Sequence, residues 1–254
     1  MPDETASARI ARLLIRARRE HRQVELGALG VELATAEDAY RAQDEIARAL
    51  GFFANERPSA WKVGASKPGA TPIAVPLPPR GIVASPAQFE ARTFHSIRIE
   101  AEIAFRFGAG IATARDHDDW RRWIDALVVT IEVVDTRIAD SDRASALAKL
   151  ADAQQHGALV IGTSIPRRDL DWKRLRAIVR RNADVVADTR GGHPLGDPSA
   201  LLPWFVRHVA ARGYDVRAGD LVTAGTWASI VPASPGDTVD VEFPEIGSAS
   251  ARFD

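Results

Sequence analysis

The segment Ile97–Phe107 constrains the fold of this chain more than any other part of its sequence. Apolar residues occupy every odd position from 97 to 107, and arginine, glutamate or alanine occupies every even position. Successive side chains of an extended chain point to opposite faces, so this period of two predicts a β-strand with one apolar face. The opposite face carries Glu100 and Glu102, flanked by Arg98 and Arg106.

Helical patterns dominate the start of the chain, and short extended runs begin near residue 61. Residues 5–22 carry apolar side chains at helical spacing, and Thr35 with Asp38 predicts a capping box that opens a helix ending at Leu50. A proline-rich stretch, 68–86, excludes a long helix there. Further on we expect helices over 118–127, 144–154 and 197–211, and strands over 128–134, 158–161, 182–188, 220–223, 239–243 and after 247. The chain is expected to divide into a helical segment, residues 1–56, packed on a β-rich body, residues 57–254.

Composition and charge exclude several classes of protein. Hydrophobic residues make up 46% and charged residues 26% of the 254 positions, which argues against a disordered or collagen-like chain. The 33 basic and 34 acidic residues nearly cancel, so nucleic acid and anionic membranes are not expected partners. No cysteine is present, which leaves oxygen and imidazole as metal ligands. Neither a secretory signal nor a run of about 18 apolar residues occurs, so we expect a cytoplasmic location.

Three glutamates form the first candidate site. Glu100 and Glu102 project from one face of the predicted strand, about 7 Å apart along it, close enough to share a divalent cation. Glu132 lies in an apolar run, 127–134, where an ionised carboxylate must be protonated, paired or metal-bound. If the two strands are neighbours, the three carboxylates converge, and hard oxygen ligands favour Mg²⁺ or Mn²⁺ over zinc.

Each of these glutamates also has a structural interpretation. Charged faces are common on strands that meet water on one side, and Arg98 and Arg106 would then be ion-pair partners. Glu132 can form a salt bridge with Arg137. The spacing alone leaves both interpretations open.

Lys62 and His156 are further candidates. Lys62 lies between Trp61 and Val63 in a chain whose basic residues are otherwise almost all arginine. A desolvated ammonium can lose its proton and act as acid or base, and a lysine that extends its charged end to solvent is the structural alternative. His156 lies at the predicted connection from a helix to the next strand, where it can line a site or serve as a structural residue. No Walker loop, Gly-x-Ser-x-Gly or His-Glu-x-x-His motif occurs.

Six short motifs then appear in a fixed order along most of the chain. They are Asp38-Ala-Tyr-Arg-Ala-Gln43, Trp61-Lys-Val-Gly64, Arg98-Ile-Glu-Ala-Glu-Ile-Ala104, Glu132-Val-Val-Asp-Thr-Arg-Ile138, Gly157-Ala-Leu-Val-Ile-Gly162, and the tail from Ala218-Gly-Asp-Leu-Val-Thr-Ala-Gly-Thr226 through Pro235-Gly-Asp237. Each motif alone is modest, but six in order are specific. The chain resembles the 2-keto-4-pentenoate hydratase and 4-oxalocrotonate decarboxylase family, within the fumarylacetoacetate hydrolase superfamily.

This resemblance implies an α+β fold, with a mixed, mostly antiparallel β-roll, peripheral helices and an N-terminal helical segment, and usually a homo-oligomer. It implies Mg²⁺ or Mn²⁺ held by the three carboxylates that the spacing selects. Lys62 matches the family's catalytic lysine, and Gly225 and Thr226 lie where the backbone closes the family's substrate pocket.

The implied substrate is a small 2-oxo acid. In a hydratase the dienol ketonises and water adds to the conjugated double bond, which gives a 4-hydroxy-2-oxo acid, with Lys62 as the proton carrier. The cation stabilises the enolate that forms when a carbon-bound proton moves. In a decarboxylase the same enolate receives the electrons left by CO₂, so the metal ligands do not choose between the two reactions.

Two positions depart from the best-known hydratases of the family. In those hydratases an acidic residue follows the lysine motif, and it is replaced within Pro78-Pro79-Arg80 of this chain. A serine that precedes the strand at 158 is replaced by Gln155. Both positions face the substrate, so Gln155, His156 and Arg80 are candidate substrate-binding residues. Arg80 would meet a second substrate carboxylate or simply lie at the surface.

The leading functional hypothesis is a hydratase of a 2-hydroxypenta-2,4-dienoate or its 2-oxo tautomer. The alternatives are a 2-oxo dicarboxylate decarboxylase, a C–C bond hydrolase, and a protein that binds metal and a 2-oxo acid without turnover.

Overall fold

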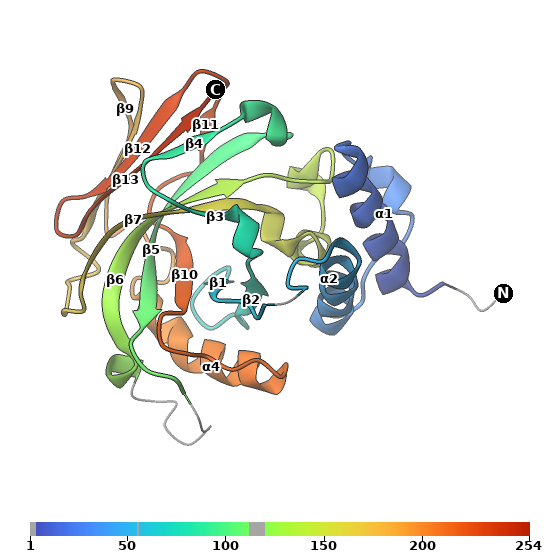
Figure 1. Cartoon of the computed structure of the whole chain (residues 1–254), viewed down its shortest axis with the longest axis horizontal. Coiled ribbons are helices and arrows are strands. Elements are labelled where there is room, and N and C mark those ends of the chain that lie inside the picture. The colour runs from blue at the N-terminus through green and yellow to red at the C-terminus, as the bar shows by residue number, and fades with distance from the viewer. Residues whose placement is uncertain (1–3, 55, 112–119) are drawn as a thin grey trace.

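Two β-sheets and a group of helices make up the structure. The computed structural model describes residues 4–54, 56–111 and 120–254 (Figure 1). Among these residues the larger sheet contains β1 (Ala60–Gly64), β2 (Ile73–Pro76), β3 (Ile82–Ala84), β5 (Ile97–Phe107), β6 (Ile124–Val134), β7 (His156–Pro166), β10 (Leu221–Thr226) and β11 (Val231–Ala233). In space the order is β2-β1-β10-β5-β6-β7-β3, and β11 also pairs with β5.

The smaller sheet has the order β4-β13-β12-β8-β9. Its strands are β4 (Ala87–Phe89), β8 (Arg176–Arg181), β9 (Asp184–Arg190), β12 (Thr238–Phe243) and β13 (Gly247–Phe253). The pairs β1–β10, β3–β7 and β4–β13 are parallel, and the other described pairs are antiparallel. The predicted α+β fold with a mixed, mostly antiparallel sheet is therefore confirmed.

The long strands β5 and β6 form the centre of the larger sheet. The alternating segment that the sequence singles out is β5 with the predicted bounds, and it pairs with β6 from Arg98 opposite Val134 to Phe107 opposite Ile124. Its apolar face contributes to a core between the two sheets that also contains Trp227, Phe243 and Phe253. The central strands are thus held by packing on one face, which leaves the other face free to carry polar groups.

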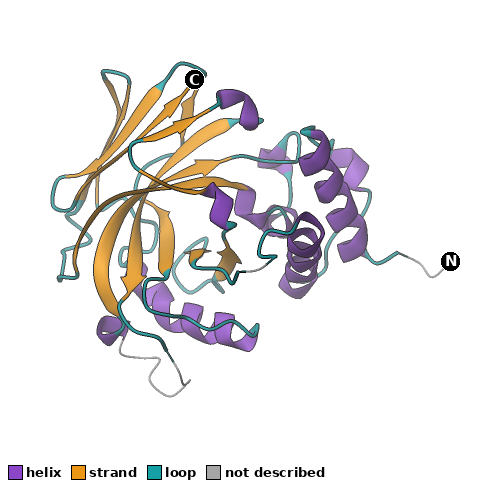
Figure 2. Cartoon of the chain, in the orientation of Figure 1, coloured by secondary structure: helices purple, strands orange, loops and turns teal. Residues whose placement is uncertain are grey.

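The helices lie mostly at the end of the molecule away from the smaller sheet (Figure 2). α1 (Ala6–Glu20), α2 (Ala36–Leu50) and α3 (Ala146–Ala151) share a second core, in which Ile10, Tyr40 and Leu150 are buried. The capping box at Thr35 and Asp38 is present, and Gly51 closes α2 in the left-handed conformation that glycine favours. No helix in the described part of the chain is long and apolar enough to cross a membrane.

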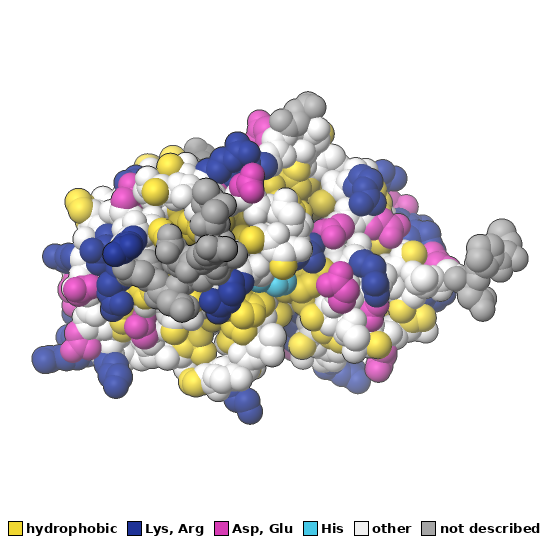
Figure 3. Space-filling model, turned by 90° about the horizontal axis from the view of Figure 1, so that it is seen from below, with side chains coloured by type: hydrophobic (Ala, Val, Ile, Leu, Met, Phe, Trp, Pro, Cys, Tyr) yellow, Lys and Arg dark blue, Asp and Glu magenta, His cyan; other side chains and the backbone are white. Residues whose placement is uncertain are grey.

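α4 (Leu202–Ala211) covers the lower edge of the larger sheet (Figure 1). Its Phe205 packs edge-on against Trp61 of β1. On the face seen from below, hydrophobic side chains gather at the centre and charged side chains lie around them (Figure 3).

The prediction of a helix over 118–127 is wrong for residues 120–127, which the structure describes. Trp120–Arg122 form one 3₁₀ turn, and β6 begins at Ile124; residues 118 and 119 lie outside the described residues. The spacing of Trp120, Trp123 and Leu127 fits a helix. Pairing with β5 along its whole length nevertheless extends the strand, because packing against neighbouring strands overrides local periodicity.

Two other helix boundaries are corrected. α3 ends at Ala151, three residues before the predicted end, because Ala153–Gln155 have left-handed backbone angles that a helix excludes. Over 197–211, Asp197 caps a 3₁₀ turn, Pro198–Leu201, and α4 begins only at Leu202.

The strand expected over 182–188 is shifted. Asn182 has a φ of 56° and forms the turn between β8 and β9, so the strand starts at Asp184. β8 itself was not predicted, because arginines stand at both of its ends and in its interior and hide its apolar centre.

Candidate active site

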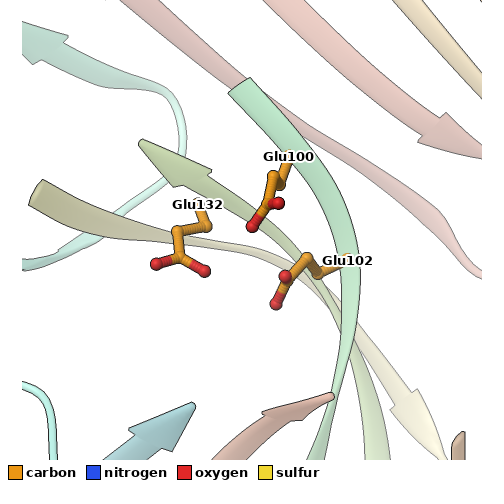
Figure 4. A group of neighbouring side chains, drawn as sticks. All are labelled: Glu100, Glu102 and Glu132. Atoms are coloured by element: carbon orange, nitrogen blue, oxygen red, sulfur yellow. The ribbon is translucent and has the colours of Figure 1, made fainter. Parts of the chain in front are cut away.

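Strand pairing brings the three glutamates together. Glu100 of β5 lies directly opposite Glu132 of β6, and Glu102 lies two residues further along the same face of β5. One carboxylate oxygen from each residue lies within 4.8 Å of the others. Figure 4 shows the three side chains pointing toward one another.

The carboxylates are buried rather than solvated. Glu102 and Glu132 are fully buried, and the side chain of Glu100 is 13% exposed. Burial, together with repulsion from Glu132 and Glu100, raises the pKa of Glu102 well above its ordinary value. Burial also raises the pKa of Glu132 to about 7, with Glu100 adding to the shift and Lys62 opposing it. The solvated charged face that the sequence left open does not occur here.

Lys62 reaches this cluster from β1. Its Nζ lies 2.8 Å from Glu132 Oε2 and 3.4 Å from Glu100 Oε2, and it donates a hydrogen bond to the backbone carbonyl of Gln154 at 3.4 Å. Burial alone would lower the pKa of Lys62, but the nearby carboxylates, Glu132 first, outweigh it and hold that pKa above its ordinary value. The side chain is therefore a charged ammonium in this structure.

His156, the first residue of β7, contacts the cluster from the other side of Glu132. Its Nδ1 lies 3.2 Å from Glu132 Oε1. Burial, with the charges of Lys62 and Arg137, lowers the pKa of His156 well below its ordinary value, so the ring is neutral. A neutral imidazole beside a carboxylate donates its Nδ1–H, so His156 orients Glu132.

β10 supplies a further polar contact. Thr223 donates its hydroxyl hydrogen to Glu102 Oε2. A bulge follows, in which Gly225 has a φ of 102°, a conformation that requires glycine, and Thr226 then pairs opposite Glu102. The structure thus places Thr226 and the bulge at Gly225 on the strand beside Glu102, and their role in closing a substrate pocket stays a prediction.

The donor set fits a hard divalent cation. All three groups are carboxylates, and Glu102 Oε1 is buried without a hydrogen-bond donor among the described residues. Carboxylates crowded in this way repel one another, as the raised pKa values of Glu102 and Glu132 show. A bound cation would remove that repulsion and satisfy the free oxygen.

Two cavities adjoin this group of side chains. The first, about 390 Å³, is lined by Lys62, Gln154 and Lys149 among others. The second, about 280 Å³, is lined by His156 and Arg80. Arg80 is exposed and lines the second cavity, whereas Lys62 lines the first.

Gln155 lies in the turn before β7. Its backbone carbonyl accepts a hydrogen bond from Asp135 N at 2.8 Å, and its side-chain Nε2 is buried without a partner among the described residues. The residue as a whole is half-buried, and its role in substrate binding stays a prediction.

Sequence reasoning missed two contacts in this site. Thr223 lies within the recognised tail motif but was not singled out, because its hydroxyl meets Glu102 only through the register of β10 on β5. The Gln154 carbonyl that accepts from Lys62 is a backbone atom, and no residue type marks it in a sequence.

Comparison with known proteins agrees with this geometry. The family model described as fumarylacetoacetate (FAA) hydrolase C-terminal matches residues 40–254. The chain belongs to the fumarylacetoacetate hydrolase family. The family predicted from the six motifs is thereby confirmed, and the curated relatives carry both of its expected names.

A 2-keto-4-pentenoate hydratase of Paraburkholderia xenovorans (strain LB400) is 30% identical over 162 residues, which are 63% of this chain and 60% of that protein. A 4-oxalocrotonate decarboxylase of Pseudomonas putida is 28% identical over 158 residues, 61% of this chain and 60% of that protein. The chain thus matches about three-fifths of the length of these relatives.

One similar solved structure covers nearly the whole chain. It is a 4-oxalocrotonate decarboxylase from Pseudomonas putida G7, complexed with magnesium and adipate. The TM-score is 0.84 with 24% sequence identity, over 96% of each chain. At this identity the similarity establishes the fold.

Proposed function

We propose that this protein is a divalent-metal-dependent hydratase that adds water to a 2-hydroxypenta-2,4-dienoate or its 2-oxo tautomer. The observation that carries this proposal is a buried group of three carboxylates, two of which form ion pairs with one lysine. The relative named 2-keto-4-pentenoate hydratase supports the choice of reaction.

Glu100, Glu102 and Glu132 would hold the cation. Carboxylate oxygens suit both Mg²⁺ and Mn²⁺, and Mg²⁺ is the choice here because the similar solved structure was complexed with magnesium. When bound, it would supply electrostatic stabilisation of the negative charge that develops on the oxygens of an enolising 2-oxo acid.

Lys62 would carry the proton. Its ammonium already holds a proton at Nζ and is fixed by Glu132, Glu100 and the Gln154 carbonyl. Delivery of that proton to the terminal carbon of the dienol gives a conjugated 2-oxo-enoate. The enol hydroxyl loses its proton as the keto group forms, and the lysine regains a proton in this step. Water then adds across the double bond and gives a 4-hydroxy-2-oxo acid.

Product analysis tests this proposal. We expect the purified protein, with Mg²⁺ and 2-hydroxypenta-2,4-dienoate, to yield a product that contains one added water and every carbon of the substrate, as measured by mass spectrometry. Lys62→Met should bind Mg²⁺ and lose at least about a hundredfold in kcat, as expected for removal of a general acid–base group. The matched control is Lys67→Met, which removes an exposed lysine five residues away. Its Mg²⁺ binding and kcat should equal those of the unaltered protein. Unchanged kcat in Lys62→Met would remove Lys62 from this role.

A second candidate is decarboxylation of a 2-oxo dicarboxylate, because a relative of that name matches over a similar length. The same experiment separates the reactions. Decarboxylation releases CO₂, hydrolysis of a C–C bond gives two acids, and a binding protein without turnover leaves every 2-oxo acid intact while still binding it.

A further inference from the structure

An unusual backbone segment lies directly beside Lys62. Three consecutive residues other than glycine, Ala153, Gln154 and Gln155, have φ values of 53°, 51° and 60°. The left-handed region is disfavoured for residues with a Cβ atom, and single residues rather than runs normally adopt it. Such a turn persists only where its surroundings hold it in place.

Arg137 holds this turn from both ends. On the N-terminal side its Nε donates to Asp152 Oδ1 at 2.7 Å and its Nη2 donates to the Asp152 carbonyl at 3.0 Å. On the C-terminal side its Nη1 donates to the His156 carbonyl at 3.0 Å. The Arg137 backbone N–H also donates to Asp152 Oδ2 at 2.9 Å. A single planar guanidinium thus fixes the two residues that flank the turn.

The surrounding charges make this arrangement rigid. The side chains of Arg137 and Asp152 are 3% and 0% exposed. Arg18 of α1 donates a further hydrogen bond to Asp152 Oδ1 at 3.1 Å, so the N-terminal helix also contacts the turn. Breaking a buried pair of this kind leaves an uncompensated charge, which is why the pair resists rearrangement.

The turn delivers two groups to the active site. Gln154, at its centre, presents its carbonyl oxygen to Lys62 Nζ. His156, immediately after it, presents Nδ1 to Glu132 Oε1. Neither contact survives if the chain leaves the left-handed conformation, because that rotation moves the Gln154 carbonyl and the start of β7 together.

We propose that Arg137 is a positioning residue that clamps the left-handed turn 153–155 and thereby sets Lys62 and Glu132 in their working geometry. The proposal deepens the hydratase function and rests on it for the catalytic readout. Arg137 touches neither a bound cation nor a substrate in this scheme; it acts through Gln154 and His156.

Arg137→Met is the test, and Arg143→Met, which removes an exposed arginine from the same connection between β6 and β7, is the matched control. Two quantities are measured well below the melting temperature: Mg²⁺ affinity by isothermal titration, and kcat and KM for hydration of the dienoate. We expect Arg137→Met to weaken Mg²⁺ binding by about tenfold or more and to lower kcat by a similar factor, with KM little changed. Arg143→Met should change none of these.

A merely structural role for Arg137 gives a different result. The melting temperature then falls while Mg²⁺ affinity and kcat of the folded protein stay at the level of the control, and that outcome overturns the proposal. If Arg137→Met does not fold, Arg137→Lys, which keeps the charge but loses the fork, and Asp152→Asn, which keeps the shape but loses the charge, are measured in the same way. Losses in Mg²⁺ affinity and kcat in these variants support the proposal, and their absence contradicts it.

The Mg²⁺ titration also separates this proposal from the function itself. If the unaltered protein hydrates no dienoate, the hydratase function fails, yet a selective loss of Mg²⁺ affinity in Arg137→Met still supports the positioning role. If the unaltered protein hydrates the dienoate and Arg137→Met matches it in both readouts, the positioning role fails alone.

Discussion

At the scale of single residues, charge is concentrated where the chain can least solvate it. Three carboxylates and one ammonium meet beneath the surface, with a neutral His156 against Glu132. Full ionisation of all three carboxylates is unfavourable in the metal-free protein, because one ammonium does not balance three anions, and the pKa values of Glu102 and Glu132 are raised accordingly. Such a site lowers the stability of the metal-free protein and favours the binding of a divalent cation.

The pH dependence of metal binding follows from the same shifts. Because the pKa of Glu132 lies at about 7 and that of Glu102 is also raised, Mg²⁺ must displace protons from these carboxylates below that pH. Apparent Mg²⁺ affinity should therefore rise as pH increases from 6 to 8, by up to about tenfold per unit for each proton displaced. Isothermal titration at three pH values measures this, and an affinity independent of pH would show that the carboxylates are ionised before the cation arrives.

Glu102→Gln should separate stability from function. The substitution keeps the size of the side chain and removes a buried carboxyl whose ionisation is opposed by burial and by Glu132 and Glu100. We expect the metal-free melting temperature to stay equal or rise, and Mg²⁺ affinity to fall at least about tenfold. The exposed Glu90→Gln is the control and should change neither quantity. A lower melting temperature with intact Mg²⁺ affinity would mean that Glu102 is a structural residue.

Much of this residue-scale arrangement could be predicted from the sequence. Glu132 stands out because an apolar run surrounds it, and Glu100 and Glu102 stand out because of their period of two. The contacts of Lys62 could not be predicted from spacing, because β10, from the far end of the chain, lies between β1 and β5. The contacts of Arg137 could not be predicted either. The sequence suggested a salt bridge between Arg137 and Glu132, whereas the structure pairs Arg137 with Asp152.

At the scale of elements, strands with a strong periodic pattern were the easiest to predict. β5 has its predicted bounds because alternation and burial agree over its whole length. β6 was mispredicted at its start because three apolar residues happen to lie at helical spacing, and only its pairing with β5 shows that the strand continues. The turn after α3 follows from contacts with Arg137 rather than from local propensity.

The two sheets approach each other closely where β7 crosses β13, at Gly162 and Gly247. A Cβ atom at Gly162 of β7 would lie 2.6 Å from Ala249 Cβ and would also collide with the Ser248 carbonyl of β13. Gly162→Ala should therefore lower the free energy of unfolding by about 1–3 kcal/mol, the usual cost of overpacking.

Chemical denaturation measures this change. Gly27→Ala is the control, because a Cβ atom at Gly27 meets nothing within 4 Å. Equal free energies of unfolding in the two variants would contradict this prediction. They would show that β7 and β13 move apart to accommodate the methyl group at little cost in free energy.

At the scale of the whole molecule, the helices are tied to the β-rich body on both sides of the site. Arg18 links α1 to Asp152. On α4, the His208 ring lies 5.0 Å from Tyr40 of α2 and stacks on Trp204 at 4.4 Å. The N-terminal helices therefore share their stability with the body rather than standing apart from it.

This contact between α2 and α4 should make stability sensitive to acid. Burial, with the nearby charge of Arg212, lowers the pKa of His208 to about 4, whereas an unfolded histidine has a pKa of about 6.5. The unfolded chain then binds a proton that the folded chain does not, so the contribution of His208 is present above pH 6.5 and is lost as pH falls toward 4.

His208→Gln should flatten the fall in melting temperature below pH 6.5 relative to the unaltered protein. The other histidines contribute equally to both proteins, so the difference between the two curves isolates His208. Parallel curves would show that the ring is protonated at no cost in the folded state.

The most direct test of the central claim, a carboxylate site that binds a 2-oxo acid through a cation, is isothermal titration of oxalate, which mimics the enolised 2-oxo acid. It is performed with Mg²⁺ present and again after chelation. We predict binding of oxalate with Mg²⁺ and none after chelation, with Glu132→Gln abolishing the binding that requires Mg²⁺. Absence of binding in both states would contradict the claim and leave the three glutamates with a structural role.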